Sequence, residues 1–446
     1  MSRWGKNRRA KAAAAGIVAA VAIAPAAFAT EGYFQAGYGA RSKALAGSGA
    51  ADSRDAMSLS VNPAGLVDVD DQLNAGASLF MPYRGYDVTG PGLIAPGFTP
   101  GGKVNSSRNV FGIPYFGYSR HITPDSAWGV AIYGNGGMNT TYRMPANVNC
   151  GGGFGVFCGG KTGVDLNQAF VTVGYAHRFG NLSVGIAPVF AFQMFKAYGL
   201  LPFAGVSSNP LALSNNGYDK SIGGGVRGGV QWKVAPNFRI GLSGSTQMYM
   251  QKFDKYAGLF ADGGKFNVPA NITAGVAWDV RPDVTLMMDY KRIFYSGVGA
   301  VSNASNVPLP LGFPGGPGFG WKDVDVVSVG AEWRVNPVWT LRAGYAHNTN
   351  PVTARDVTLN LLAPGVVTDH FTAGLNYKLS PNSSIDVAAM YVPTHRVTGI
   401  EVTPPPPNGI GANPFRTVSL RMHQFELTVG YNYKFGGAAP PVVAKY

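Results

Sequence analysis

Charged residues are scarce in this chain, at 13% of its 446 residues, whereas a soluble domain usually carries about 25%. Long apolar runs are also missing, because no segment after residue 29 approaches the roughly 18 apolar residues of a membrane-spanning helix. Glycine and aromatic residues are instead abundant. These features argue against an ordinary soluble domain and against transmembrane helices. A transmembrane β-barrel accounts for them, because it carries its hydrophobicity in alternate residues.

Cysteine is limited to Cys150 and Cys158, which flank a glycine-rich segment. A metal site would need further ligands nearby, and the sequence offers none. In an oxidising compartment this spacing permits a small closed loop. We therefore predict a disulfide that stiffens one surface loop, and no bound metal or cofactor.

Export is indicated by residues 1–29, which have the layout of a secretory signal peptide. A basic start is followed by an apolar run over 12–24 and by the small-x-small pattern Ala27-Phe28-Ala29. The alternative is a membrane anchor, for which the apolar run is short. We expect the mature chain to begin at Thr30.

The formal net charge is +13, which raises the question of a nucleic-acid partner. The basic residues are scattered singly and form no stripe, and the chain is expected to be exported, so nucleic acid is excluded. Outer-membrane lipid, lipopolysaccharide or an anionic substrate are more natural partners for this charge.

From residue 72 onward, segments of roughly 10–18 residues alternate apolar and polar side chains and then stop at a turn. In 425–435, for example, every second residue is apolar or aromatic. Short turns such as Arg281-Pro282-Asp283 alternate with long loops, and this pattern predicts an all-β fold, a 14-stranded antiparallel transmembrane β-barrel over 72–435. The predicted strands lie near 72–84, 108–121, 126–142, 163–179, 182–199, 218–234, 237–253, 266–280, 283–296, 322–335, 338–349, 367–379, 383–398 and 419–435.

Aromatic residues gather near the ends of these strands, as in the two interfacial girdles of a membrane barrel. They include Trp128, Tyr175, Phe179, Trp232, Trp278, Trp333, Trp339, Tyr377, Tyr431 and Tyr433.

Two regions break the alternation. Residues 30–71 are rich in Gly, Ala and Ser, and we predict that they form a small N-terminal hatch that plugs the barrel lumen. Residues 436–446 contain a Pro-Pro pair and are predicted to form a loose periplasmic tail.

Within the predicted hatch, several short motifs occur in a fixed order. They are Phe34-Gln35, Gly39-Ala40-Arg41, Ala46-Gly47-Ser48-Gly49-Ala50, Asp55-Ala56 and above all Asn62-Pro63-Ala64, just before the first strand. This region resembles the hatch of the FadL family, the outer-membrane transporters of long-chain fatty acids and aromatic hydrocarbons. Asn62, Pro63 and Ala64 match the family's hatch motif, for which we expect a structural role.

The resemblance implies a bacterial outer-membrane location, a monomer, and passive uptake of hydrophobic small molecules, with long-chain fatty acids as the first expectation and aromatic hydrocarbons as the second. It implies that a ligand enters between the external loops, binds in an apolar pocket beside the hatch, and leaves sideways at a kink in the third strand. Phe34 matches a hatch phenylalanine that helps line that pocket; the alternative is a plug residue that packs on the wall.

The third predicted strand contains Gly134, Gly136 and Gly137. Glycines weaken a strand and permit a bulge or an inward bend, so these residues are candidates for the lateral-gate kink. The alternative is that they ease packing of the wall against the hatch.

The residue parity of the strands predicts which side chains face the lumen, although a slip of one residue would reverse the assignment. The apolar candidates for the ligand path are Phe195, Tyr249, Met287, Ile293 and Met390. Arg227, Arg239, Lys291 and Arg342 also face inward by this count, and Arg227 is a candidate for binding a carboxylate head group. We favour the alternative that these cations pair with Glu332, Asp386, Glu426, Asp52 or Asp55.

A general diffusion porin is the main alternative function. It would have a polar lumen and no N-terminal plug, in contrast to the predicted hatch and the apolar lumen residues. An enzyme would need a nucleophile and a base in one constellation. The six histidines are scattered, and we predict a transporter without catalytic residues.

Overall fold

The computed structural model describes residues 31–90, 98–402 and 413–435. Its strands form one antiparallel sheet that closes into a barrel, because β1 (Gln72–Thr89) pairs with β16 (Asn413–Lys434) along its whole length. The described residues form sixteen strands, and without the short β2 and β9 the wall has the predicted fourteen. The predicted signal peptide with Thr30 and the predicted tail 436–446 lie outside the described residues.

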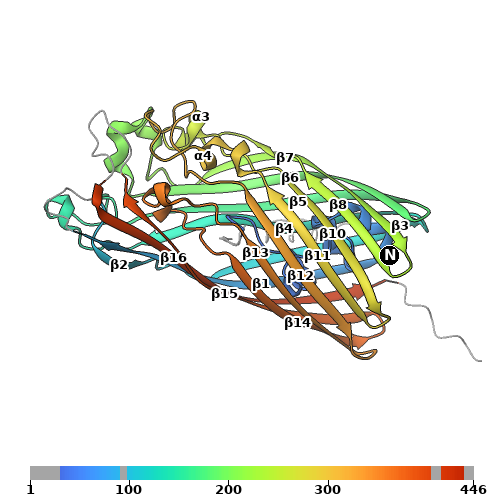
Figure 1. Ribbon diagram of the computed structural model, residues 1–446. Helices are drawn as coiled ribbons and strands as arrows, with labels where there is room; N and C mark the ends of the chain where they lie inside the picture. Colours follow the sequence, from blue (N-terminus) through green and yellow to red (C-terminus); the bar gives the residue numbers. More distant parts are fainter. Residues whose placement is uncertain (1–30, 91–97, 403–412, 436–446) are drawn as a thin grey trace, which may run out of the picture.

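The wall follows the sequence order, with each strand antiparallel to the next (Figure 1). Its other strands are β3 (Phe111–Thr123), β4 (Ser126–Tyr142), β5 (Thr162–Phe179), β6 (Leu182–Tyr198), β7 (Asp219–Ala235), β8 (Phe238–Ser245), β10 (Asn271–Arg281), β11 (Val284–Ile293), β12 (Val324–Arg334), β13 (Trp339–Asn348), β14 (Asp369–Ser380) and β15 (Ser383–Glu401). β2 (Gly102–Asn105) pairs with the outer end of β1, and β9 (Tyr249–Met250) pairs with β7.

The period-two pattern is what divides each strand between lumen and lipid. In β6, Val184, Ile186, Phe190 and Phe192 are exposed on the outer face, while the residues between them are buried. A closed wall leaves no open sheet edge in the hydrocarbon, which is the condition for a β-structure to cross a bilayer. Among the described residues no helix is long and apolar enough to span a membrane.

The aromatic residues predicted as two girdles are all exposed on the barrel. They lie at the ends of strands that meet the short turns, for example Trp232 before the turn after β7 and Trp339 at the start of β13. The prediction of two girdles from these residues was therefore wrong, because strand direction places all of them at the periplasmic end.

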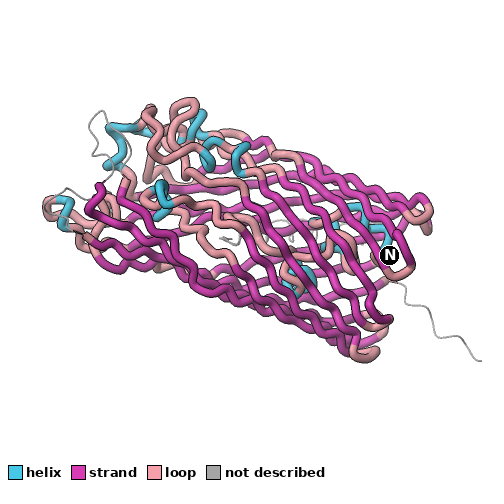
Figure 2. The backbone as a smooth tube through the Cα atoms, in the orientation of Figure 1, coloured by secondary structure: helices cyan, strands magenta, loops and turns pink. Residues whose placement is uncertain are grey.

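The hatch lies inside the barrel as α2 (Gly39–Ala44), η1 (Ala56–Ser60) and η2 (Pro63–Asp68) (Figure 2). The remaining helical turns belong to the loops. They are η3 (Val148–Cys150), η4 (Leu201–Val206), η5 (Pro210–Ala212), η6 (Asp254–Tyr256), α3 (Ala261–Gly264), η7 (Tyr295–Gly297), α4 (Gly299–Ser302), η8 (Ala354–Asp356) and η9 (Leu359–Leu361). Cys150 and Cys158 form the predicted disulfide, with Cα atoms 5.4 Å apart.

Candidate functional site

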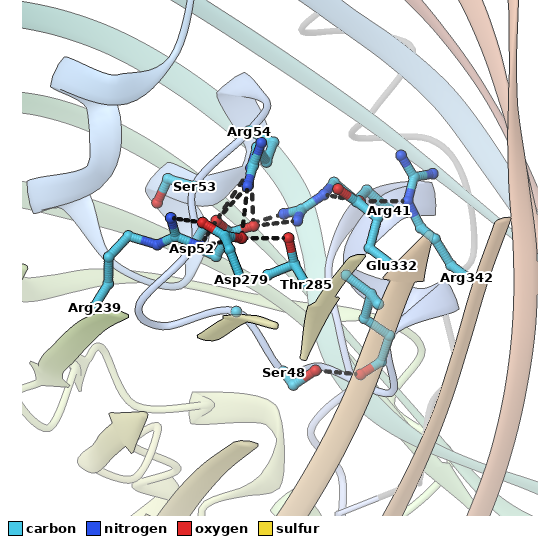
Figure 3. Close-up of polar contacts among 12 residues, drawn as sticks. Arg41, Ser48, Asp52, Ser53, Arg54, Arg239, Asp279, Thr285, Glu332 and Arg342 are labelled. Atoms are coloured by element: carbon cyan, nitrogen blue, oxygen red, sulfur yellow. Dashed lines mark hydrogen bonds and ion pairs between the residues drawn. The ribbon is translucent and has the colours of Figure 1, made fainter. Parts of the chain in front are cut away.

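A buried ionic network fixes the middle of the hatch to the wall (Figure 3). The Arg41 guanidinium lies 2.6 Å from the Asp52 carboxylate and 2.9 Å from that of Glu332. Arg342 pairs with the same Glu332 at 2.8 Å and with Asp386. All five side chains are buried. Because each charge has an opposite partner in a site with little water, removing one would leave the others uncompensated.

Further ion pairs join hatch and wall. Arg239 lies 3.0 Å from Asp52, which together with the pairs of Arg342 confirms the predicted pairing for two of the four inward cations. Lys291 pairs with Glu31, an acid that the prediction did not include. Arg227 donates to the backbone carbonyls of Ser60 and Val61 in the hatch, so it holds the plug in place by hydrogen bonds.

The Asn62-Pro63-Ala64 motif starts η2 and docks it on the wall. The Asn62 side chain accepts from the Ala64 amide at 3.1 Å and donates to the Val230 carbonyl at 3.1 Å, while Pro63 occupies the first helical position, where no amide donor is needed. Gly185 faces the motif, and a Cβ there would lie 2.4 Å from the Pro63 carbonyl carbon. Glycine in the wall therefore allows the helix to approach.

The strand pairing of the wall is interrupted between β3 and β4, and we call this unpaired stretch the opening. Their pairing stops at Tyr115 and Tyr133, although β4 continues to Tyr142. Backbone hydrogen bonding across this gap, which we call the seam, resumes where the Ser107 amide donates to the Thr141 carbonyl at 2.8 Å. Residues 134–140 thus have no partner on β3, and this edge of β4 must satisfy its hydrogen bonds elsewhere.

The hatch supplies backbone partners for residues 135–137 of this edge. Phe34 forms an antiparallel bridge with Gly136, and the Gln35 amide donates to the Asn135 carbonyl at 3.2 Å. The register of β4 against β5 shifts between Gly134 and Gly136, which leaves Asn135 as the extra residue of a bulge. A Cβ on Gly136 would lie 1.7 Å from the Tyr33 carbonyl oxygen. Gly136 therefore serves the close approach of the hatch as well as the bend.

Gly136→Val should detach the first residues of the hatch. The added side chain cannot fit against the Tyr33 carbonyl, and β4 is anchored along β5, so the hatch must move. We expect amide hydrogen exchange over 31–38 to become faster, while exchange in β5 stays slow. Gly112→Val is the matched control, because a Cβ at Gly112 meets open space. Equal protection of 31–38 in both variants would contradict this assignment.

The lumen side of the opening is covered by apolar and cationic side chains. Phe80, Phe111 and Ile113 form a buried cluster. Arg84 crosses from β1, donates to the Asn139 carbonyl and holds its guanidinium 5.5 Å from the centre of the Phe111 ring. The gap in hydrogen bonding is therefore filled by side chains that can move without breaking a strand ladder.

A cavity lies between the hatch and the wall strands β7, β10, β11 and β12. Its lining combines Phe34, Tyr38 and Val326 with Arg227 and Asp289. Phe34 contacts the Tyr33 ring with centroids 5.5 Å apart, so it both lines the cavity and packs in the plug. Contrary to the expectation of an apolar pocket, the cavity has a mixed lining.

Glu31 also lines the cavity, where burial raises the pKa of its carboxyl against the opposing effect of Lys291. A raised folded-state pKa means that the folded hatch binds the proton more tightly than the unfolded segment does. The contribution of the Glu31 carboxyl to the stability of the hatch is therefore fully present below the ordinary pKa of a glutamate. It is lost as pH rises through the raised pKa. We expect protection of 31–38 in hydrogen exchange to fall over that range, and Glu31→Gln to remove the dependence. An unchanged pH profile in Glu31→Gln would contradict the role of this carboxyl.

The apolar candidates for the ligand path have different surroundings. Ile293 and Met390 are buried toward the lumen, as their parity predicts. Met287 is also buried, but it packs against Leu45 and Ala51 of the hatch and is not part of the lining of the cavity described above. These residues belong to the packing between plug and wall.

Tyr249 corrects the prediction, because its side chain is 69% exposed and points to the outer face. Arg227 faces Ser245, whereas Gly223 faces Met250, so the second strand contains one extra residue between these pairs. This bulge reverses the parity after Ser245, and Met250 is the residue that turns inward. The uninterrupted strand predicted over 237–253 could not reveal the reversal.

Phe195, a predicted ligand-path residue, contacts aromatic side chains of the external loops that the sequence analysis did not identify. The centroid of the Phe195 ring lies 4.6 Å from that of Phe260. The Phe260 and Phe266 centroids are 4.8 Å apart, and those of Phe266 and the hatch residue Tyr33 are 6.0 Å apart. These contacts connect the external loops with Phe34. The loop residues escaped prediction because irregular segments have no parity; the number of aromatics in the loop after β9 was the one available signal.

The disulfide loop closes part of the external mouth. Phe157, between the two cysteines, contacts Phe98 at 5.5 Å and Phe203 at 5.2 Å between ring centroids. Within the described residues no group of three or more His, Cys, Asp or Glu is arranged to hold a metal ion.

Comparison with known proteins gives the family. The profile of the family described as "Outer membrane protein transport protein (OMPP1/FadL/TodX)" matches residues 15–435. The chain belongs to this family. As an OMPP1/FadL/TodX member it is an outer-membrane transporter for hydrophobic substrates in Gram-negative bacteria, and its relatives are channels, not enzymes.

Solved structures share the fold of this OMPP1/FadL/TodX member. The Pseudomonas putida toluene transporter TodX is 18% identical with a TM-score of 0.62, covering 91% of this chain and 100% of its own. A Pseudomonas aeruginosa FadL homologue is 16% identical with a TM-score of 0.62, at 90% and 100% coverage. The Ralstonia pickettii toluene transporter TbuX is 19% identical with a TM-score of 0.57, at 90% and 99% coverage. No curated protein sequence matches the chain.

Proposed function

We propose that this chain takes up hydrophobic small molecules by passive transport, with a sideways exit between β3 and β4. Long-chain fatty acids are the first choice of cargo, and aromatic hydrocarbons are the second. The observation that carries the proposal is the open seam between the Tyr115–Tyr133 pair and Thr141, whose β4 edge is covered by the hatch. A ligand that displaces residues 33–35 also uncovers this edge. Binding beside Phe34 and opening of the exit are thereby coupled through one short segment.

Entry is supported by the aromatic contacts from Phe195 through Phe260 and Phe266 to Tyr33. An apolar cargo that follows these rings stays out of water over most of the path. At the other end, the hatch fills the lumen and is held by buried ion pairs. A sideways step into lipid therefore costs a greasy molecule less than passage through the plug into the periplasm.

Fatty acids are the first choice because the cavity offers cations to a carboxylate. Lys291 and Arg227 both line it, and a charged head group could compete with Glu31 for Lys291. Aromatic hydrocarbons are the second choice, supported by the aromatic path and by relatives described as toluene transporters. A general diffusion porin remains the contrasting alternative, which the filled lumen disfavours.

The test is uptake of labelled oleate, toluene and a small sugar by cells that lack their own transporter and express this chain. We expect saturable oleate uptake and little sugar uptake. Phe34→Ala should weaken oleate uptake, whereas Phe371→Ala on the outer face, where Phe371 is 51% exposed, should leave it unchanged. Uptake of toluene without oleate would identify aromatic hydrocarbons as the cargo. Uptake of the sugar without oleate or toluene would overturn the proposal in favour of a porin.

A further inference from the structure

The outer face of the barrel carries a basic patch at the extracellular ends of β5, β6 and β7. Lys196 and Lys220 point away from the lumen, because their neighbours Phe195 and Ser221 are buried on the inner side. We define the basic patch by Arg108, Lys161, Lys196, Lys220 and Lys255.

Asp165 lies at the centre of the patch and orders its side chains. This carboxylate is fully buried, lies 2.7 Å from the Arg108 guanidinium and 3.9 Å from the Lys196 ammonium, and accepts a hydrogen bond from the Tyr218 hydroxyl at 2.6 Å. Lys196 lies 4.2 Å from the centre of the Tyr218 ring. The Lys196 head group is therefore positioned in advance, which lowers the entropy cost of binding an anion.

The other cations of the patch surround this centre. Lys161 lies 5.4 Å from the centre of the Tyr198 ring, and the Lys255 ammonium donates to the Tyr218 carbonyl at 2.9 Å. Lys220 is exposed and has no ion pair among the described residues.

Acidic groups near the patch do not cancel its charge. Asp165 is enclosed, and the Asp219 carboxylate accepts the backbone amides of Lys220 and Lys255 at 2.9 Å each. Asp254 is the exposed acid beside Lys255. The patch thus presents five cations against three carboxylates, of which two are already hydrogen-bonded within the protein.

On the opposite side of the barrel, acidic side chains outnumber basic ones at the extracellular end. On β11 and β12, Arg292 is paired with Asp323 and Asp325, and Asp369 on β14 accepts from Tyr345 at 2.7 Å. The sector at β11, β12 and β14 therefore lacks the excess of cations found at β5–β7.

The height of the patch on the barrel identifies its surroundings. Phe192 and Ile222 are register partners on the outer face, 48% and 51% exposed, as expected for side chains among acyl chains. Lys220 lies on the same face as Ile222, two residues nearer the extracellular end of β7. The patch begins where the apolar band ends, at the level of the lipid head groups.

We propose that the basic patch binds the phosphate groups of a phosphorylated glycolipid in the outer leaflet, as lipopolysaccharide provides. Phosphate oxygens accept several charge-assisted hydrogen bonds from lysine and arginine, and the acyl chains of the same lipid would rest on the apolar band below. The patch adjoins the opening in the wall, since Asp165 is the register partner of Asn139 on β4. The proposal does not depend on which cargo is carried.

The test is native mass spectrometry of the full-length purified protein with lipid A that carries its phosphates, with dephosphorylated lipid A, and with inorganic phosphate. Lys196→Gln with Lys220→Gln removes two cations from the patch and should weaken binding of phosphorylated lipid A by about 30-fold. Lys233→Gln with Lys378→Gln, at the periplasmic ends of β7 and β14, is the matched control and should bind as the wild type does.

Four results would overturn the proposal. They are unchanged binding in the Lys196/Lys220 variant, an equal loss in the control, equal affinity for dephosphorylated lipid A, or equal affinity for inorganic phosphate, which would make the site one for soluble anions. Unfolding of the double variant is checked by its mobility as a heat-modifiable barrel. If it fails to fold, Lys220→Gln alone gives the same comparison with an expected loss of about fivefold.

Discussion

Deletion of Asn135 should lower uptake of hydrophobic cargo at least about tenfold, which corresponds to about 1.4 kcal/mol of barrier. Asn135 is the extra residue between the Gly134 and Gly136 pairs with β5. Without it the register of β4 becomes continuous, and its edge can pair with Phe111–Pro114 of β3, which now pair with β1 alone. A closed seam leaves the cargo no sideways exit.

The control for this deletion is removal of Val280, the extra residue at the irregularity between β10 and β11 near the periplasmic turn. This variant should fold and transport as the wild type does. Both proteins are compared for heat-modifiable mobility and then for initial rates of oleate uptake. Full transport by a correctly folded Asn135 deletion would show that the seam is not the exit.

Glu332→Gln should turn the plugged barrel into a leaky one. Glu332 is buried and pairs with both Arg41 of the hatch and Arg342 of the wall. Loss of its charge leaves two guanidinium groups under-compensated, and removing one partner of a buried ion pair typically costs roughly 3–5 kcal/mol. Because Arg41 belongs to the hatch, the free energy lost is that which holds the plug against β12 and β13.

The expected result is faster swelling of liposomes in a small sugar, together with a lower melting temperature. Arg281→Gln is the matched control, because its pair with Asp283 is at a turn, with 66% of the Arg281 side chain exposed, and exposed pairs contribute about 0–1 kcal/mol. Swelling of the Glu332→Gln liposomes at the wild-type rate would contradict an ionic anchor for the hatch.

The barrel could be predicted from the sequence because the alternation of apolar and polar residues is a property of each strand by itself. A strand that separates lipid from lumen must alternate, so fourteen strands and their turns are visible in one sequence. Errors arose where the alternation is interrupted. The single extra residue between Ser245 and Tyr249 reversed the assignment of Tyr249, and β2 lies within a segment predicted as loop.

The candidate site was predictable only in part, since it depends on contacts between distant segments. The glycines of β4 indicated a bend, and the inward cations indicated ion pairs. The sequence could not show that Gly136 makes room for the Tyr33 carbonyl, or that Phe260 and Phe266 lead from the loops to the hatch. Tertiary packing sets these neighbours, and no short-range pattern encodes them.

The sideways exit between β3 and β4 is tested most directly by cross-linking during transport. Cells that express the chain take up a fatty acid with a photoreactive tail, are irradiated, and the modified residues are identified by mass spectrometry. The account predicts adducts on Phe111 and Ile113 beside the opening, and their loss in the Asn135 deletion. Adducts confined to Val67 and Asp68 at the periplasmic end of the hatch, with none at the opening, would contradict it.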